Sequence, residues 1–169
     1  MINKKKIQKI IYDLILELEE DPNREGLKDT PKRVADMICE LFQKDSTEKL
    51  IKTFEEDFSP TSPIEVKNIP FCSFCEHHML PFKGIAHIRY VPSGKSFIGL
   101  SKFARIVNHF SKGLQIQERI THSVANFIYA NFPVKGVEVT LEAEHLCMTI
   151  RGAKSMGSST KTSIKLGEI

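Results

Sequence analysis

The chain has 169 residues, a formal net charge of +3, 41% hydrophobic residues and 27% charged residues. These proportions are those of a globular protein, and the length suits one domain that buries most of its apolar surface. No apolar run approaches the roughly 20 residues that cross a bilayer, and the mild charge does not resemble the footprint of a nucleic-acid-binding protein. Four unevenly spaced cysteines suit a reducing compartment, so we expect a cytoplasmic protein whose cysteines bind metal or catalyse.

Helical patterns fill the first third of the chain. Apolar residues recur at intervals of three and four positions and predict a helix over about residues 3–20. Thr30-Pro31 has the form of an N-cap followed by a first-turn proline, which predicts a second helix. Ser46 is expected to cap a third, short helix that carries Phe54. We therefore expect residues 1–58 to form an N-terminal helical segment.

Strand patterns, rich in β-branched and aromatic residues, begin after this segment. The expected strands cover residues 64–70, 84–91, 97–100, 136–151 and 158–166, the last as an edge strand, and the expected helices cover about 101–112 and 115–131. Ser101 is the expected N-cap of the first of these two helices, and Gly113 is its expected end. Helices, then strands, then two helices, then further strands indicate an α+β fold.

A dense group of metal-binding side chains follows the first predicted strand. It contains Cys72, Cys75, Glu76, His77 and His78. The spacing Cys75-x-x-His78 suits a soft metal and selects zinc over magnesium or calcium. The motif Cys72-x-x-Cys75 resembles half of a zinc ribbon, but the chain has no second Cys-x-x-Cys. In an extended segment Cys72 would also face away from Cys75, so we leave it out of the metal site. Two ligands do not make a site, so a third must come from elsewhere.

The predicted strand over 136–151 offers a third ligand. Its odd positions are apolar up to Ala143, whereas the odd positions that follow include His145, Cys147 and Arg151. Because alternate side chains share one face of a strand, a regular strand would bring these three to the face that was core. Cys147 is then the candidate ligand. The alternative is that Cys147 is a small buried hydrophobic residue, and this strand leaves both readings open.

A candidate anion site lies at the start of the helix over 101–112. Lys102 and Arg105 are neighbours on the helix surface, and a helix N-terminus adds free backbone N–H groups and a positive dipole. Gly99, just before this helix, has no side chain and would let the backbone approach a bound anion closely. The alternative is a solvated basic face with a capping serine. The chain has no Walker-type loop, so a triphosphate would not be held as in P-loop enzymes.

Several motifs occur in order along residues 20–167. They are residues 21–27, 29–35, 75–78, 81–82, 98–102, 114–119 and 142–148, together with Arg105, Arg151 and Gly152. As an ordered set they resemble the GTP cyclohydrolase I family. The resemblance implies a tunnelling fold, in which an antiparallel sheet backed by helices assembles into a toroidal homodecamer of two pentamers. Residues 59–169 would form the catalytic domain, with active sites at subunit interfaces.

The resemblance also implies the reaction. GTP would be converted to 7,8-dihydroneopterin triphosphate and formate, the first step of folate and pterin biosynthesis, with zinc as cofactor. The implied zinc ligands are Cys75, His78 and Cys147. The implied acid/base groups are His77 and His145, with Ser101 as a further proton-transfer candidate. Three protein ligands leave zinc an open position for water, whose pKa falls to roughly 7.

The resemblance to the family also implies which residues contact the substrate. Lys102, Arg105 and Arg151 are the implied triphosphate contacts, and Arg33 is expected to reach a neighbouring subunit's site. Glu118 is the implied guanine anchor, with Gln117 adjacent. A carboxylate can accept from both N1–H and the 2-amino group of guanine, a donor pair that adenine lacks.

Two positions depart from the family pattern, and two other functions compete. Asp36 stands where lysine is common in the family, and Gly113 stands where arginine is common. One competing function is another tunnelling-fold enzyme that acts on a different pterin or deazapurine substrate. The other is a non-catalytic, zinc-stabilised oligomer that binds GTP. An assay for formate and dihydroneopterin triphosphate from GTP, with and without a chelator, separates the three.

Overall fold

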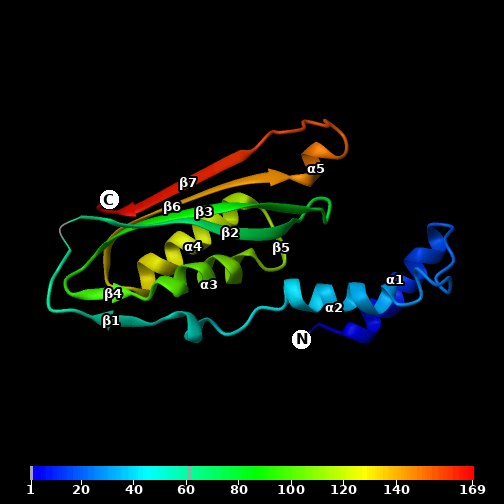
Figure 1. The fold of residues 1–169 in the computed structure, drawn as a ribbon, viewed down its shortest axis with the longest axis horizontal. Helices are drawn as coiled ribbons and strands as arrows, with labels where there is room; N and C mark the ends of the chain where they lie inside the picture. The colour runs from blue at the N-terminus through cyan, green and yellow to red at the C-terminus, as the bar shows by residue number, and fades with distance from the viewer. Residues whose placement is uncertain (1, 61) are drawn as a thin grey trace. The chain divides into compact units, whose positions relative to one another are not determined.

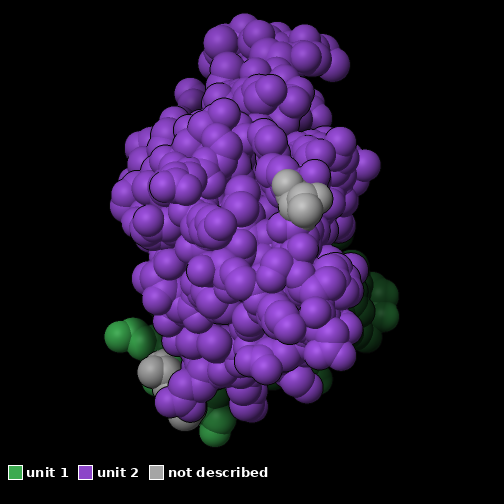
Figure 2. All heavy atoms as spheres, turned by 90° about the vertical axis from the view of Figure 1, so that its left-hand side faces the viewer, with its two compact units in different colours: residues 1–44 green, residues 45–169 purple. Residues whose placement is uncertain are grey.

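The computed structural model describes residues 2–60 and 62–169, and its contacts divide the chain into two compact units, Met1–Lys44 and Asp45–Ile169 (Figure 2). The first unit consists of two helices, and the second contains the sheet with its helices. Residues 45–58 group with the second unit. Helices and a mainly antiparallel sheet together confirm the expected α+β class. In the described parts of the chain no helix is both long and apolar enough to cross a bilayer.

The first unit pairs α1 (Lys4–Glu17) with α2 (Thr30–Phe42). Asn3 caps α1, because its side-chain oxygen accepts from the backbone N–H of Lys6 at 3.0 Å. Asp29 occupies the N-cap position of α2, so Thr30 is the first helical residue and not the cap that we predicted. Proline in that first turn is compatible with the helix because its missing N–H would have no partner there.

The second unit is built on a five-stranded sheet with the order β5-β2-β3-β6-β7 (Figure 1). The strands are β2 (Ile64–Cys75), β3 (Pro81–Pro92), β5 (Leu114–Gln115), β6 (Val134–His145) and β7 (Thr160–Gly167). β5 pairs with β2 in parallel, and the other pairs are antiparallel. β7 is an edge strand, as predicted. A separate ribbon pairs β1 (Thr53–Glu55) with β4 (Ser96–Ile98).

Two helices, α3 (Leu100–Ser111) and α4 (Gln117–Asn131), cover one face of the sheet (Figure 1). Ile120, Val124 and Ile128 of α4 are fully buried, as their helical spacing predicts. They pack with buried residues of α3 and with the inward positions of β3 and β6 in one apolar core. This core fixes α4 against the sheet and thereby places the first turn of α4 near the end of β6.

Several predicted boundaries are wrong. α3 begins at Leu100 with Gly99 at the N-cap position, so Ser101 lies inside the helix and does not cap it. Ser46 does cap a short 3-10 helix, η1 (Thr47–Leu50), through the N–H of Glu48, but Phe54 lies in β1.

The most consequential difference concerns the predicted strand over 136–151. β6 ends at His145, and α5 (Leu146–Thr149) follows at once. The pairing of β6 with β3 ends at His145 opposite Phe82, because β3 begins at Pro81 and no partner strand continues. The chain then closes a helical turn in which Ile150 N donates to Leu146 O at 3.1 Å. His145, Cys147 and Arg151 therefore do not share a strand face.

Candidate metal centre and active site

The turn between β2 and β3 carries the first group of site residues. It is closed by two backbone hydrogen bonds, from Cys75 N to Leu80 O and from Met79 N to Cys75 O, each 2.9 Å long. Met79 has φ of 54°, in the left-handed region, which lets the chain reverse within a few residues. The turn keeps Cys75 buried at the end of β2 and leaves His77 and His78 exposed.

Cys75, His78 and Cys147 offer ligand atoms that all lie within 4.8 Å of one another. Zinc bonds of about 2.0–2.3 Å would place tetrahedral ligand atoms roughly 3.5–3.8 Å apart, so shifts of about 1 Å would close the site. Two thiols and an imidazole are the donor set that zinc favours. No other group of this kind occurs among residues 2–60 and 62–169. The predicted three residues are thus brought together, and they fit zinc.

The surroundings of these three residues bear on ligation. Burial and the neighbouring Cys75 thiol raise the pKa of the Cys147 thiol above its ordinary value. His77 Nδ1 lies 3.5 Å from the sulfur of Cys75. Arg151 Nη1 donates to His78 Nε2 at 2.7 Å. Because a guanidinium can only donate, this bond uses a lone pair of His78, so a metal on that nitrogen and Arg151 are alternative partners.

His145 ends β6 in a position fixed on two sides. Its ring stacks on Phe82, with centroids 4.4 Å apart and planes 5° apart, and its Nε2 lies 2.8 Å from Gln117 Oε1. Burial lowers the pKa of His145 below its ordinary value, and the nearby Glu118 carboxylate opposes this shift. The net shift therefore favours the neutral imidazole of His145 over the charged form.

The first turn of α4 supplies three consecutive polar residues with different surroundings. Gln117 is only 1% exposed, and its amide is bonded entirely within the chain. Glu118 is exposed and close enough to His145 to act on it electrostatically. Arg119 turns toward the metal-binding turn. The sequence predicted a substrate-facing role for Gln117 and Glu118, and the structure leaves only Glu118 open to solvent.

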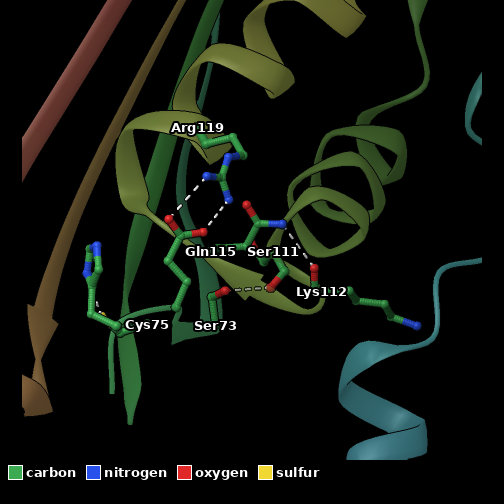
Figure 3. A network of polar contacts seen from close by, with 8 residues as sticks. Ser73, Cys75, Ser111, Lys112, Gln115 and Arg119 are labelled. Atoms are coloured by element: carbon green, nitrogen blue, oxygen red, sulfur yellow. Dashed lines mark hydrogen bonds and ion pairs between the residues drawn. The ribbon is translucent and has the colours of Figure 1, made fainter. Parts of the chain in front are cut away.

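Arg119 and Glu76 form a bidentate ion pair with N···O distances of 2.7 and 3.3 Å (Figure 3). The guanidinium holds the pKa of the Glu76 carboxyl below its usual range. The same region is tied by the backbone, because Glu76 N donates to Gln115 O at 3.0 Å and β5 pairs with β2 there. The pair therefore links the metal-binding turn to the start of α4. Sequence reasoning missed it, since no local spacing signals a contact between residues 43 positions apart.

The residues predicted to bind triphosphate have separate partners. Lys102 is 9% exposed, and its Nζ donates to the carbonyl oxygen of Lys49 at 2.9 Å. Arg105 lines a cavity of about 310 Å³ together with Asp45, Ser46, Lys49, Leu50, Asn108, His109 and Lys112. Ser101 is exposed at the start of α3. Arg33 belongs to the first unit, where it pairs with Asp29 at 3.2 Å. Arg151, as described above, contacts His78.

Comparison with solved structures identifies the fold. The archaeosine synthase QueF-Like in its apo form, a tunnel-fold enzyme, superposes with a TM-score of 0.54. The alignment covers 66% of this chain and 99% of that chain, at 16% sequence identity. At that identity the likeness shows a shared fold and nothing of the chemistry.

Comparison of sequences identifies the family. The family profile described as GTP cyclohydrolase I matches residues 7–169. The curated GTP cyclohydrolase 1 of Streptococcus mutans is 48% identical over 170 residues, which cover 99% of this chain and 88% of that protein. The GTP cyclohydrolase 1 of Caldanaerobacter subterraneus subsp. tengcongensis is 48% identical over 169 residues, covering 99% and 89%. The chain belongs to the GTP cyclohydrolase I family.

Proposed function

We propose that this protein is a zinc-dependent GTP cyclohydrolase that opens the imidazole ring of guanine in GTP and yields 7,8-dihydroneopterin triphosphate and formate. The reaction would be the first step of folate and pterin biosynthesis, in the cytoplasm. Family membership over nearly the whole chain supports the activity. The structural observation that carries the proposal is the group of Cys75, His78 and Cys147, with His145 only two residues from the third ligand.

The proposed metal site has the composition of a catalytic zinc site, because three protein ligands leave room for a fourth partner. When bound, zinc would act as a Lewis acid that activates water for attack on C8 of the guanine. Cys75 and Cys147 would hold the metal as thiolates. The raised pKa of Cys147 means that its thiol must lose a proton on metal binding.

His145 is the proposed acid/base group at N7 of the guanine: its imidazole would first take up a proton from water, deliver that proton to N7 during ring opening, and later recover it. Burial lowers the pKa of its imidazole, which favours the neutral form, and Phe82 holds the ring in one orientation, so the ring can take up and deliver protons without reorganising. His77 is the second proposed acid/base group. It is exposed on the metal-binding turn, which suits the proton transfers that accompany opening and rearrangement of the ribose, with Ser101 as a further candidate.

Glu118 is the proposed guanine anchor. Its exposed carboxylate lies in the first turn of α4 and close enough to His145 to influence its pKa, so a base held by Glu118 would lie near the proposed acid. The carboxylate would accept from N1–H and the 2-amino group. Adenine offers no such donor pair and would leave the carboxylate without partners, which favours guanine.

Lys102, Arg105 and Arg151 are the proposed triphosphate contacts, with Arg33 reaching the site of a neighbouring subunit. To bind phosphate, Lys102 would exchange the Lys49 carbonyl for an anionic partner, and Arg151 would exchange His78. Both exchanges favour the anion, because a charge-assisted hydrogen bond to phosphate is stronger than a bond to a neutral acceptor.

The proposed assembly is a toroidal homodecamer of two pentamers with active sites at subunit interfaces. The exposed edge of β7 supports sheet pairing between subunits, since an edge strand presents unpaired backbone groups to another strand. Neither nucleic acid nor a membrane is a proposed partner. Native mass spectrometry would measure the subunit number, and a monomer at working concentration would refute the assembly.

One assay tests the proposed activity. The protein is loaded with zinc and incubated with GTP, with and without a chelator, and formate is measured together with neopterin fluorescence after oxidation and dephosphorylation. The proposal expects both products and their loss with chelator. Zinc and GTP binding without formate would indicate a non-catalytic GTP-binding protein. GTP that yields no fluorescent neopterin would indicate an enzyme for a different substrate.

A further inference from the structure

We infer that Gln117 is a positioning residue that fixes the tautomer of His145, so that His145 carries its proton on Nε2 and exchanges protons with the substrate through Nδ1. The inference rests on the proposed function, in which His145 is the acid/base group of ring opening. It assigns Gln117 an indirect role in place of the substrate contact that its sequence position suggests.

The contact between the side chains of Gln117 and His145 does not by itself show which ring nitrogen of His145 carries the proton. Gln117 Oε1 and His145 Nε2 are 2.8 Å apart. A neutral imidazole carries one proton, on either nitrogen, and an amide side chain could present oxygen or nitrogen in the same place. The assignment therefore depends on what holds the amide on its other side.

The amide nitrogen of Gln117 faces three acceptors. It lies 3.0 Å from Leu141 O in β6, 2.9 Å from Thr160 O in β7 and 3.1 Å from Thr162 Oγ1. Two of these are backbone carbonyl oxygens, which can only accept. If the amide were reversed, its oxygen would face these carbonyls with no hydrogen between them, inside a site where Gln117 is 1% exposed.

The direction of the hydrogen bond between Gln117 and Thr162, the third acceptor, is fixed as well. Thr121 Oγ1 donates its only hydrogen to the backbone carbonyl of Gln117 at 2.9 Å. Thr121 Oγ1 also lies 2.7 Å from Thr162 Oγ1, so Thr162 must be the donor in that bond. Thr162 then has no hydrogen left for Gln117 and can only accept from its amide nitrogen. The whole cluster therefore has one consistent set of donors.

The direction of the last hydrogen bond follows. With its nitrogen turned to β6 and β7, Gln117 presents Oε1 to His145, and an amide oxygen can only accept. His145 Nε2 must therefore carry the proton, and in the neutral ring Nδ1 keeps its lone pair. The stack on Phe82 prevents the ring from turning out of this arrangement. Nδ1 is then the nitrogen that is available to exchange a proton with the substrate.

The test measures the tautomer of His145 and the turnover of GTP separately. Histidine is labelled with ¹⁵N, and solid-state NMR of the zinc-loaded protein locates the proton of each ring, with His145→Ala identifying the His145 signals. The wild-type protein should show a protonated Nε2 and a bare Nδ1. Gln117→Met has a similar length but no strong acceptor, and it should spread the proton over both nitrogens. For a tautomer-fixing residue, kcat should fall about 10²- to 10⁴-fold while KM for GTP stays within about threefold.

Thr121→Val is the matched control for loss of structure. It removes a hydroxyl from the same cluster and leaves the contact between Gln117 and His145 in place, so it should lower stability without moving the proton of His145. A wild-type His145 protonated on Nδ1 would overturn the inference without any variant. So would a Gln117→Met protein with unchanged tautomer and kcat, or one with a raised KM and unchanged kcat, since the last would mean direct contact with GTP. A wild-type protein that does not turn over GTP would refute the proposed function, and the tautomer measurement would still decide the hydrogen-bond assignment.

Discussion

The metal-binding group and the start of α3 contain residues predicted to act on the same substrate, yet the structure organises them differently. Cys75, His78 and Cys147 have ligand atoms within 4.8 Å of one another. Lys102 instead donates to the carbonyl of Lys49, and Arg105 lines a cavity that is bounded by α3 and by residues of the segment 45–50. Cysteine and histidine side chains are short and have few rotatable bonds, so the backbone fold largely fixes the positions of their ligand atoms. Long cationic side chains have many rotamers, so the fold fixes only the region within their reach.

The largest expected effect is on the metal-binding group. Cys147→Ser should remove bound zinc and lower formate release by about 10³-fold or more, because Lewis-acid activation of water is lost. Metal analysis of the purified protein and the formate assay measure the two effects. Cys72→Ser is the control, since Cys72 is an exposed thiol on the same strand as Cys75 and should keep both zinc and activity. Full activity of Cys147→Ser at low metal would show that the ligand assignment is wrong.

The next effect separates chemistry from metal binding. His145→Ala should keep zinc and lower kcat by about 10²- to 10⁴-fold, the usual contribution of a positioned acid/base group. Zinc content and GTP turnover are measured on the same preparation. His122→Ala, on the exposed face of α4, should change neither. Unchanged turnover in His145→Ala would remove this residue from the mechanism.

The sequence predicted the residues of the metal-binding group better than the geometry that assembles them. Cys147 was nominated because a regular strand would carry it to the core face, but β6 ends at His145 and α5 carries Cys147 to the group. The alternation of apolar and polar residues shows which side chains share a face of a strand, but it does not show where the strand ends. The end of β6 depends on where the partner strand β3 begins, which is a property of the pairing and not of the local sequence.

Elements with a strong apolar pattern were predicted well, whereas long-range polar contacts were not. The buried face of α4 and the edge strand β7 follow from spacing that lies within a single segment. The pair of Glu76 with Arg119 and the hydrogen bonds of Gln117 join segments far apart in the chain. Such contacts depend on the register between elements, which the local pattern does not contain.

The start of α3 gives a smaller and more discriminating test. Arg105→Met should raise KM for GTP about tenfold, through loss of a charged hydrogen bond to phosphate, with little change in Tm. Lys102→Met should also raise KM, and it should lower stability by about 1 kcal/mol because the bond to the Lys49 carbonyl is lost. Steady-state kinetics and thermal unfolding measure both. If Lys102→Met lowers Tm and leaves KM unchanged, Lys102 holds η1 against α3 and does not bind the triphosphate.

The smallest expected effect concerns the link between the metal-binding turn and α4. The ion pair of Glu76 with Arg119 is exposed, so Arg119→Met should barely change Tm. It should nevertheless speed zinc loss to a chelator by up to about tenfold, because the pair orients the turn that carries two of the ligands. Arg89→Met removes a longer, partly exposed ion pair on the sheet, with Glu138 at 3.7 Å, and should not alter zinc loss. Equal rates in the wild type and both variants would mean that backbone bonds alone, such as that from Glu76 N to Gln115 O, hold the turn in place.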